Sequence, residues 1–178
     1  MTWYNPIPLT LVPTTDFESF RYMAPGETGL PLNPHPGAFA VQRKYHVHEG
    51  VDMYVPPGTP VCTVESGQVL DVRLFTGPNL GHEWWLNTYA VWVEGASGVV
   101  VYGEIEPCVS IGQQLIAGDQ IGKVIPVLVK DKGRPTSMLH LELRESGNTD
   151  DIEWIDFDQQ PAALRDPTPF LMCAGQAQ

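Results

Sequence analysis

The sequence has few positive charges and no long apolar run. Lysine and arginine total 10 against 21 aspartates and glutamates in 178 residues, which gives a formal net charge of −11. No stretch gathers enough basic side chains to follow a phosphate backbone, so nucleic-acid binding is disfavoured. No window approaches the roughly 20 apolar residues that a membrane-spanning helix needs, and membrane insertion is therefore not expected.

Cysteines and leader-like features are also scarce. Cys62, Cys108 and Cys173 are odd in number, widely spaced and without a CxxC pair, which excludes a zinc knuckle and a thioredoxin-type motif. The first 20 residues lack a basic segment and contain prolines where a secretory signal is apolar, so we expect a cytoplasmic protein.

The distribution of glycine and proline indicates the fold class. Each of them occurs 17 times, which argues against long helices. Residues 1–43 are rich in proline and show no periodic pattern, so we expect an irregular N-terminal arm packed on the core. Residues 44–178 alternate short β-branched segments with glycine turns, and residues 89–93 and 99–102 flank a hairpin signal. These patterns predict a mainly β, compact antiparallel single domain, with a proline-defined extended segment at 166–171.

Three residues outline a candidate metal site. In an ideal strand His48 and Asp52 would lie roughly 13 Å apart, and Gly50 between them could supply the bend that brings them together. His140 lies on a predicted strand whose leucines face the opposite way, so its ring can point into a cleft. His48, Asp52 and His140 would leave one position open for water, as in catalytic zinc sites. On spacing alone, scattered histidines and aspartates are more often ordinary hydrogen-bonding side chains than metal ligands.

Several longer segments resemble one known family. Residues 48–61 and 65–69 resemble the signature of lysostaphin-type zinc endopeptidases, and residues 100–105, 111–122, 139–144 and 166–171 match later family segments in the same order. The resemblance covers roughly residues 44–171. It implies the compact antiparallel β fold called the duplicated hybrid motif, a peptide-like ligand or substrate, and zinc held by His48, Asp52 and His140.

Two departures from the family pattern bear on catalysis. Where the resemblance implies catalytic histidines, this sequence has Met138 and Glu104. A thioether does not carry a proton at neutral pH, and general acid–base groups typically contribute about 10²–10⁴-fold to rate. We therefore expect a zinc-binding domain with impaired or absent peptidase activity. The alternative is an active zinc-dependent peptidase or amidase that uses Glu104 as its base.

Other features leave further alternatives open. Glu142 is expected to orient His140, and His46 is either a fourth ligand or a partly exposed neighbour of the site. Zinc suits the donor set, although iron, nickel or manganese would tolerate the same ligands. A second alternative is a non-metal binding or phosphocarrier-like module in which His48 or His140 carries the phosphate. In the family, N-terminal segments can block the metal's open position, so the placement of His35 in the arm is informative.

Overall fold

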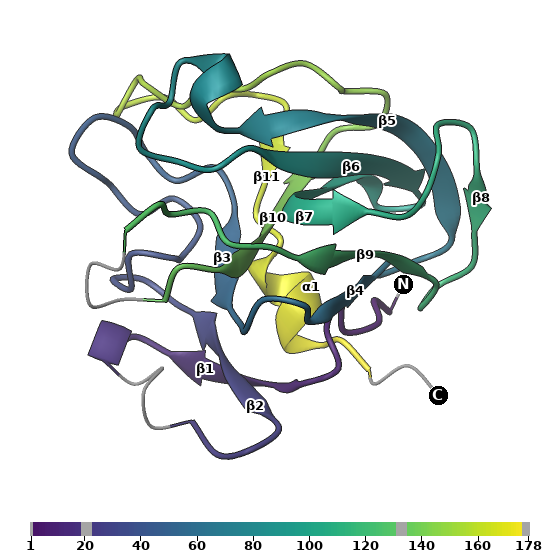
Figure 1. The fold of residues 1–178 in the computed structure, drawn as a ribbon, viewed down its shortest axis with the longest axis horizontal. Helices are drawn as coiled ribbons and strands as arrows, with labels where there is room; N and C mark the ends of the chain where they lie inside the picture. The colour runs from purple at the N-terminus through teal and green to yellow at the C-terminus, as the bar shows by residue number, and fades with distance from the viewer. Residues whose placement is uncertain (1, 19–22, 131–134, 176–178) are drawn as a thin grey trace.

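Regular structure in this protein is almost entirely β. The computed structural model describes residues 2–18, 23–130 and 135–175 (Figure 1). In chain order the elements are β1 (Thr10–Thr14), β2 (Glu27–Pro31), β3 (Val51–Tyr54), β4 (Pro60–Cys62), β5 (Gly67–Thr76), the 3-10 turn η2 (Pro78–Leu80), β6 (Thr88–Gly95), β7 (Gly98–Pro107), β8 (Gln114–Leu115), β9 (Gln120–Val124), β10 (Met138–Arg144), β11 (Leu164–Arg165) and α1 (Thr168–Met172).

One nine-stranded sheet organises the molecule. Its main path runs β11-β10-β7-β6-β5-β8, while β3 pairs with β10, and β9 pairs with both β7 and β4. Every pairing in this sheet is antiparallel. The predicted mainly β antiparallel fold is thus confirmed. The β10 strand is held on both sides, because β7 pairs with it along one edge and β3 and β11 along the other.

The predicted hairpin is the junction of β6 and β7. Gly95 pairs with Gly98 at its turn. Gly98 has a φ of 127°, and a Cβ there would lie 2.2 Å from the carbonyl oxygen of Arg144, so glycine is required twice over. Toward the other end of the hairpin the register shifts between Tyr89 and Val91. Such a bulge re-aims the side chains of the longer strand segment, which here contains Glu104.

Both faces of the sheet are covered. Alternate residues of β10 point to opposite faces, and Leu139, Leu141 and Leu143 belong to the main hydrophobic core. On the opposite face His140, Glu142 and Arg144 are buried as well. The polar face of this strand is therefore internal rather than a solvent-exposed surface.

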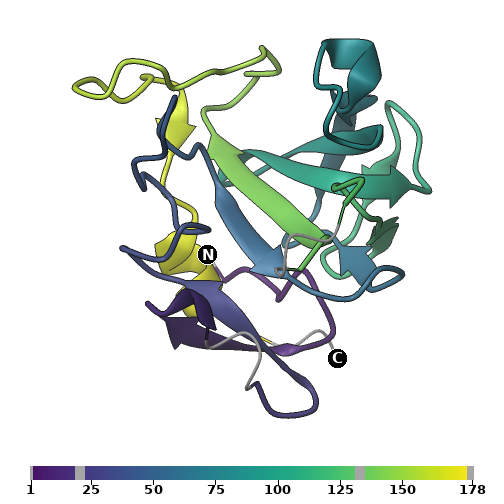
Figure 2. The same cartoon turned by 60° about the vertical axis from the view of Figure 1, so that its left-hand side comes forward.

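The N-terminal arm contains regular structure that the sequence analysis missed. β1 and β2 pair in parallel as a separate two-stranded sheet at one end of the molecule (Figure 2). Trp3, Ile7 and Leu30 of the arm are fully buried in the main core. The arm therefore packs on the core and contributes side chains to it. The division between residues 43 and 44 stays a prediction.

The predicted extended segment at 166–171 is wrong, because α1 occupies most of it. Pro167 caps this short helix and Pro169 lies in its first turn. Proline is tolerated there because the backbone N–H groups of a first turn have no partner within the helix. The side-chain carboxylate of Asp166 accepts the N–H of Thr168, which starts the turn.

Candidate metal centre

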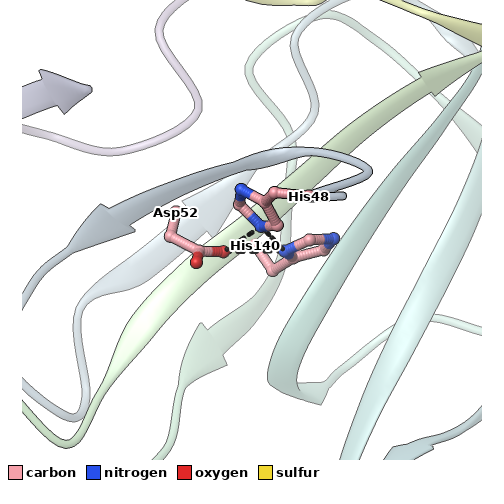
Figure 3. Close-up of side chains that lie close together, drawn as sticks. All are labelled: His48, Asp52 and His140. Carbon is pink, nitrogen blue, oxygen red and sulfur yellow. Dashed lines mark hydrogen bonds and ion pairs between the residues drawn. The ribbon is translucent and has the colours of Figure 1, made fainter. Parts of the chain in front are cut away.

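Three side chains from two neighbouring strands and the loop before them converge on one point. His48 Nε2 lies 3.1 Å from Asp52 Oδ1 and 3.3 Å from His140 Nδ1, and His140 Nδ1 lies 2.7 Å from the same carboxylate oxygen (Figure 3). β3 and β10 bring two of them together directly, since Asp52 and His140 are partners in the ladder. All three side chains are buried.

The outward nitrogens of both rings have fixed hydrogen bonds. His48 Nδ1 lies 2.9 Å from the carbonyl oxygen of Ala38, and His140 Nε2 lies 3.0 Å from Glu142 Oε1. A carbonyl or carboxylate oxygen only accepts, so each of these nitrogens carries the proton. In the neutral rings the inward nitrogens therefore present lone pairs. Second-sphere contacts of this kind are typical of metal-ligating histidines.

The donor set fits a small divalent metal ion. Two lone pairs and a carboxylate oxygen face one another within 3.3 Å, an arrangement that needs a positive charge between or upon them. Tetrahedral zinc with bonds of about 2.0–2.1 Å places its donors roughly 3.3 Å apart. Two histidines and one carboxylate are also the ligand types that zinc prefers. In the described part of the chain these three residues are the group identified as able to hold a metal.

In the metal-free protein, the pKa values of His140 and Asp52 are shifted by the charges and hydrogen bonds within the cluster. Burial alone would lower the pKa of His140, yet hydrogen bonds to Asp52 and Glu142 raise this pKa well above its usual value. Burial alone would raise the pKa of Asp52, but the charges of His48 and Arg43 and the hydrogen bonds from both histidines hold it well below its usual range. A proton thus provides the positive charge that a metal ion would otherwise supply.

Glu142 is held between His140 and a buried arginine. One carboxylate oxygen faces His140, and the other accepts from Arg144 Nε at 2.7 Å and pairs with its Nη2 at 2.6 Å. Burial alone would raise the pKa of Glu142, but the hydrogen bond to His140 and the charges of His140 and Arg144 lower it. Glu142 is thus ionised at neutral pH, and its contact with His140 Nε2 is the one through which it would orient the ring.

Glu104 lies beside the cluster in an unusual backbone conformation. Its φ is 67°, a region that non-glycine residues rarely adopt, and its Oε2 is buried without a hydrogen-bond partner in the described residues. Burial and the charge of Asp52 raise its pKa to about 8, against the opposing charges of His140 and Arg43. Strain and an unpaired buried carboxyl together are features that concentrate at functional sites.

Met138 lies on the same strand as His140, two residues earlier. It pairs with Tyr54 of β3 as His140 pairs with Asp52, so both side chains of β10 emerge on the same face. Met138 is buried. Its thioether neighbours the site without offering a titratable group.

Arg43 is a charged neighbour of Asp52 that the sequence analysis did not include. Its Nη2 donates to Asp52 Oδ2 at 2.7 Å and to the carbonyl oxygen of Pro36 at 2.8 Å. No spacing rule connects Arg43 to the ligand motif, because the chain reverses its direction between Arg43 and His48. The sequence offered no local signal for this contact, because Arg43 stands beside Lys44 and no acidic residue lies within five positions of it.

His46 and His35, the two histidines weighed beside the proposed ligands, lie outside the converging group. His46 is partly buried and sits in the turn that reverses the chain before His48, where its carbonyl oxygen accepts the N–H of Arg43. His35 is buried, its Nδ1 accepts the N–H of Gly37, and its ring packs against Phe17 and Tyr54. Through its contact with Tyr54 the arm packs against β3, and His35 is not among the donors described above.

The predicted bend at Gly50 is confirmed, and close packing is a second reason for glycine at this position. The chain bends at Gly50 before β3 begins, and a Cβ there would lie 2.5 Å from the carbonyl oxygen of Leu141 and 2.9 Å from the ring of His140.

We expect Gly50→Ala to destabilise the protein by about 1–3 kcal/mol through overpacking and to weaken metal binding by displacing His140. Urea unfolding and zinc titration measure both effects. Gly58→Ala, where the added Cβ meets no atom within 4 Å, is the comparison for zinc affinity and should leave it unchanged.

Comparison with known proteins places this site in a family. The model of peptidase family M23 matches residues 46–152, more than half of the chain, and the chain therefore belongs to that family. This span contains His48, Asp52 and His140. A search of curated protein sequences finds no match.

Solved structures share the fold at low sequence identity. The catalytic domain of the antimicrobial peptidase lysostaphin from Staphylococcus simulans superposes with a TM-score of 0.54 at 17% identity, over 89% of this chain and 99% of that domain. A chain in the structure of the SpoIIQ–SpoIIIAH pore-forming complex gives 0.53 at 17% identity, over 96% of this chain and 90% of that chain. Helicobacter pylori Csd3 gives 0.50 at 16% identity, over 97% of this chain but only 38% of the longer protein. These matches establish the lysostaphin-type fold.

The described residues contain no helix with the length and apolar character needed to cross a bilayer.

Proposed function

We propose that this M23 domain binds zinc through His48, Asp52 and His140 and hydrolyses peptides weakly or not at all. The observation that supports it most is the approach of three buried donor atoms to within 3.3 Å, each of the two rings being held by an outward hydrogen bond. Peptides are the ligands to consider, because the structurally similar lysostaphin is a peptidase.

The role of each neighbouring group follows from its contacts. Bound zinc would supply Lewis acidity and lower the pKa of a bound water to about 7. Glu142 and the Ala38 carbonyl would keep the two rings in the ligating tautomer. The remaining requirement for efficient hydrolysis is a group that moves protons at the reacting atoms.

That requirement is where this chain departs from the family pattern. Met138 carries no proton, and a carboxyl with a pKa of about 8 is mostly protonated at neutral pH in the metal-free protein. Loss of general acid–base assistance typically costs about 10²–10⁴-fold in rate. The proposal of weak or absent hydrolysis rests on these two positions.

One observation favours a second candidate, an active hydrolase with Glu104 as the base. Glu104 is buried beside the cluster, in a strained conformation, with one oxygen free of hydrogen bonds among the described residues. A positive charge at the donor set would offset the Asp52 carboxylate, whose charge helps to raise the pKa of Glu104. Glu104 would then ionise and accept a proton.

The phosphocarrier alternative has no support in the geometry. A phosphorylated histidine needs an accessible ring nitrogen with a free lone pair. Both His48 and His140 are buried, and all four of their ring nitrogens lie within hydrogen-bond distance of protein atoms. Membership of peptidase family M23 points to metal chemistry instead.

One experiment distinguishes the zinc-binding domain with little or no activity from the active hydrolase that uses Glu104. The zinc-loaded protein, the chelator-treated protein and zinc-loaded Glu104→Gln are incubated with a mixture of fluorogenic peptides, with the lysostaphin catalytic domain as positive control. The proposal predicts bound zinc and cleavage at least about 100-fold slower than the control. Rapid cleavage that both chelator and Glu104→Gln abolish would establish the second candidate and overturn the first.

The raised pKa of Glu104 also predicts how the stability of the metal-free protein depends on pH. Its pKa is about 8 in the folded chain and 4.5 ordinarily, so the folded state holds an extra proton between these values. The stabilisation is complete below pH 4.5 and is lost as the pH rises toward 8, at about 1.4 kcal/mol per unit of pKa difference. Urea unfolding of Glu104→Gln from pH 5 to 8 should give a flatter curve than the parent.

The control for this pH dependence lies on the same strand. Glu106 is more than half exposed and pairs with Lys123 at the surface. Glu106→Gln should therefore follow the parent curve. A Glu104→Gln curve that also parallels the parent would contradict the raised pKa.

A further inference from the structure

We propose that Arg43 is a positioning residue for Asp52, holding the carboxylate so that only one of its oxygens faces the two histidines. This inference rests on the proposed metal site. It assigns to the N-terminal arm and the turn that follows it a part in building that site.

The two oxygens of Asp52 have separate partners. Oδ1 faces His48 Nε2 at 3.1 Å and His140 Nδ1 at 2.7 Å. Oδ2 accepts from Arg43 Nη2 at 2.7 Å. Rotation of the carboxylate would break the ion pair with Arg43, so the pair keeps Oδ1 directed at the histidines.

Arg43 is itself held in place. Its Nη2 and Nε donate to the carbonyl oxygen of Pro36 at 2.8 and 3.2 Å, and its backbone N–H donates to the carbonyl oxygen of His46 at 2.8 Å. The planar guanidinium can bridge a carboxylate and a carbonyl at once, whereas a lysine ammonium lacks that fork. The geometry thus uses a property specific to arginine.

Three successive carbonyls of the arm support the same site. Pro36 accepts from Arg43, Gly37 accepts the backbone N–H of Asp52 at 2.8 Å, and Ala38 faces His48 Nδ1 at 2.9 Å. A Cβ on Gly37 would lie 3.2 Å from the Cβ of Asp52, which shows how closely the segment packs on the ligand strand. Arg43 therefore connects Asp52 to the backbone segment that also orients His48.

Positioning and simple electrostatics predict opposite results. The positive charge of Arg43 repels a metal ion, so if charge alone mattered its removal would tighten metal binding. If Arg43 positions Asp52, its removal weakens binding, as loss of an outer contact to a metal ligand typically does by about 10–100-fold. The sign of the change decides between them.

The experiment compares zinc affinity in Arg43→Gln, Arg43→Lys and a matched control. Arg73 suits the control because its side chain is 31% exposed, as is that of Arg43, and it also pairs with aspartates, Asp71 and Asp151. Zinc affinity is measured by competition with a chromophoric chelator, and cobalt substitution reports the ligand geometry through its absorption spectrum. We expect about 10–100-fold weaker binding and an altered cobalt spectrum for Arg43→Gln, a smaller loss for Arg43→Lys, and parental values for Arg73→Gln.

Each outcome bears on a distinct claim. Unchanged or tighter binding in Arg43→Gln, with parental zinc binding intact, overturns the role of Arg43 and leaves the metal site standing. Failure of the parent to bind zinc overturns both the site and the positioning role. Circular dichroism of the metal-free variants establishes that they are folded. If Arg43→Gln does not fold, Arg43→Lys decides, since positioning requires a measurable loss of affinity and parental affinity overturns it.

Discussion

Zinc-loaded Glu104→His/Met138→His is expected to cleave peptide substrates about 10²–10⁴-fold faster than the parent chain. The double variant restores histidine at the two positions where the family resemblance implies catalytic histidines. Both residues already lie beside the cluster, since Met138 shares a strand face with His140 and Glu104 senses the charges of Asp52 and His140. The change adds proton-carrying groups and leaves the three donors as they are.

The control for this gain is the same double variant with His48 also replaced by alanine. It should lose the added activity together with its zinc, because His48 supplies one of the three proposed donor atoms. Thermal unfolding of each protein verifies that the added histidines are accommodated. A folded, zinc-loaded double variant that cleaves no faster than the parent would show that something other than the missing histidines limits catalysis.

Glu142→Gln is expected to destabilise the protein by about 3–5 kcal/mol, because it leaves the buried guanidinium of Arg144 without a balancing charge. Glu142 and Arg144 are both almost fully buried, and they form one of the ion pairs nearest the site. The remaining described partner of Arg144 Nη1 is the carbonyl oxygen of Asp150, which is neutral. Urea unfolding followed by tryptophan fluorescence measures the loss.

A matched ion pair at the surface provides the comparison. Glu106 and Lys123 approach to 2.7 Å, but both side chains are more than half exposed. Glu106→Gln should therefore cost no more than about 1 kcal/mol. Equal losses of unfolding free energy in the two variants would mean that burial does not determine how much the Glu142–Arg144 pair contributes to stability.

The central strands could be predicted from the sequence because local pattern determined them, whereas the proposed ligand set was implied by the family resemblance and stays a proposal. The alternation of leucines with polar residues along β10 places His140 on the face opposite the core, and Gly50 marks the bend that brings His48 to Asp52. The turn of the β6–β7 hairpin is likewise marked by two glycines that lie close together in the chain. In each case, residues close together in the chain carry the information.

The features that were missed depend on contacts between distant segments or on competing local rules. The parallel pairing of β1 with β2 joins segments that are not linked by a tight turn, and parallel pairs have no turn signature. The α1 helix was read as extended because proline disfavours helix in the residue before it, yet these prolines lie at the start, where helices tolerate them. Arg43 became visible only when a chain reversal placed it against Asp52.

The support of the site therefore extends beyond the matched family segment. The family model begins at residue 46, whereas Ala38 holds the ring of His48 and Arg43 holds Asp52. Truncation at residue 43 would remove those contacts together with Trp3, Ile7 and Leu30 from the core. The arm is a structural part of the proposed metal centre, and the metal is the feature to measure.

Elemental analysis of the protein purified without added metal, beside a His48→Ala/His140→Ala variant, tests the metal centre most directly. The account predicts about one zinc ion per parent chain and none in the folded variant, because both proposed nitrogen ligands are then absent. Absence of metal from the parent, even after zinc is offered, would contradict the account. The converging histidines and Asp52 would then be a buried hydrogen-bonded cluster within an M23 fold.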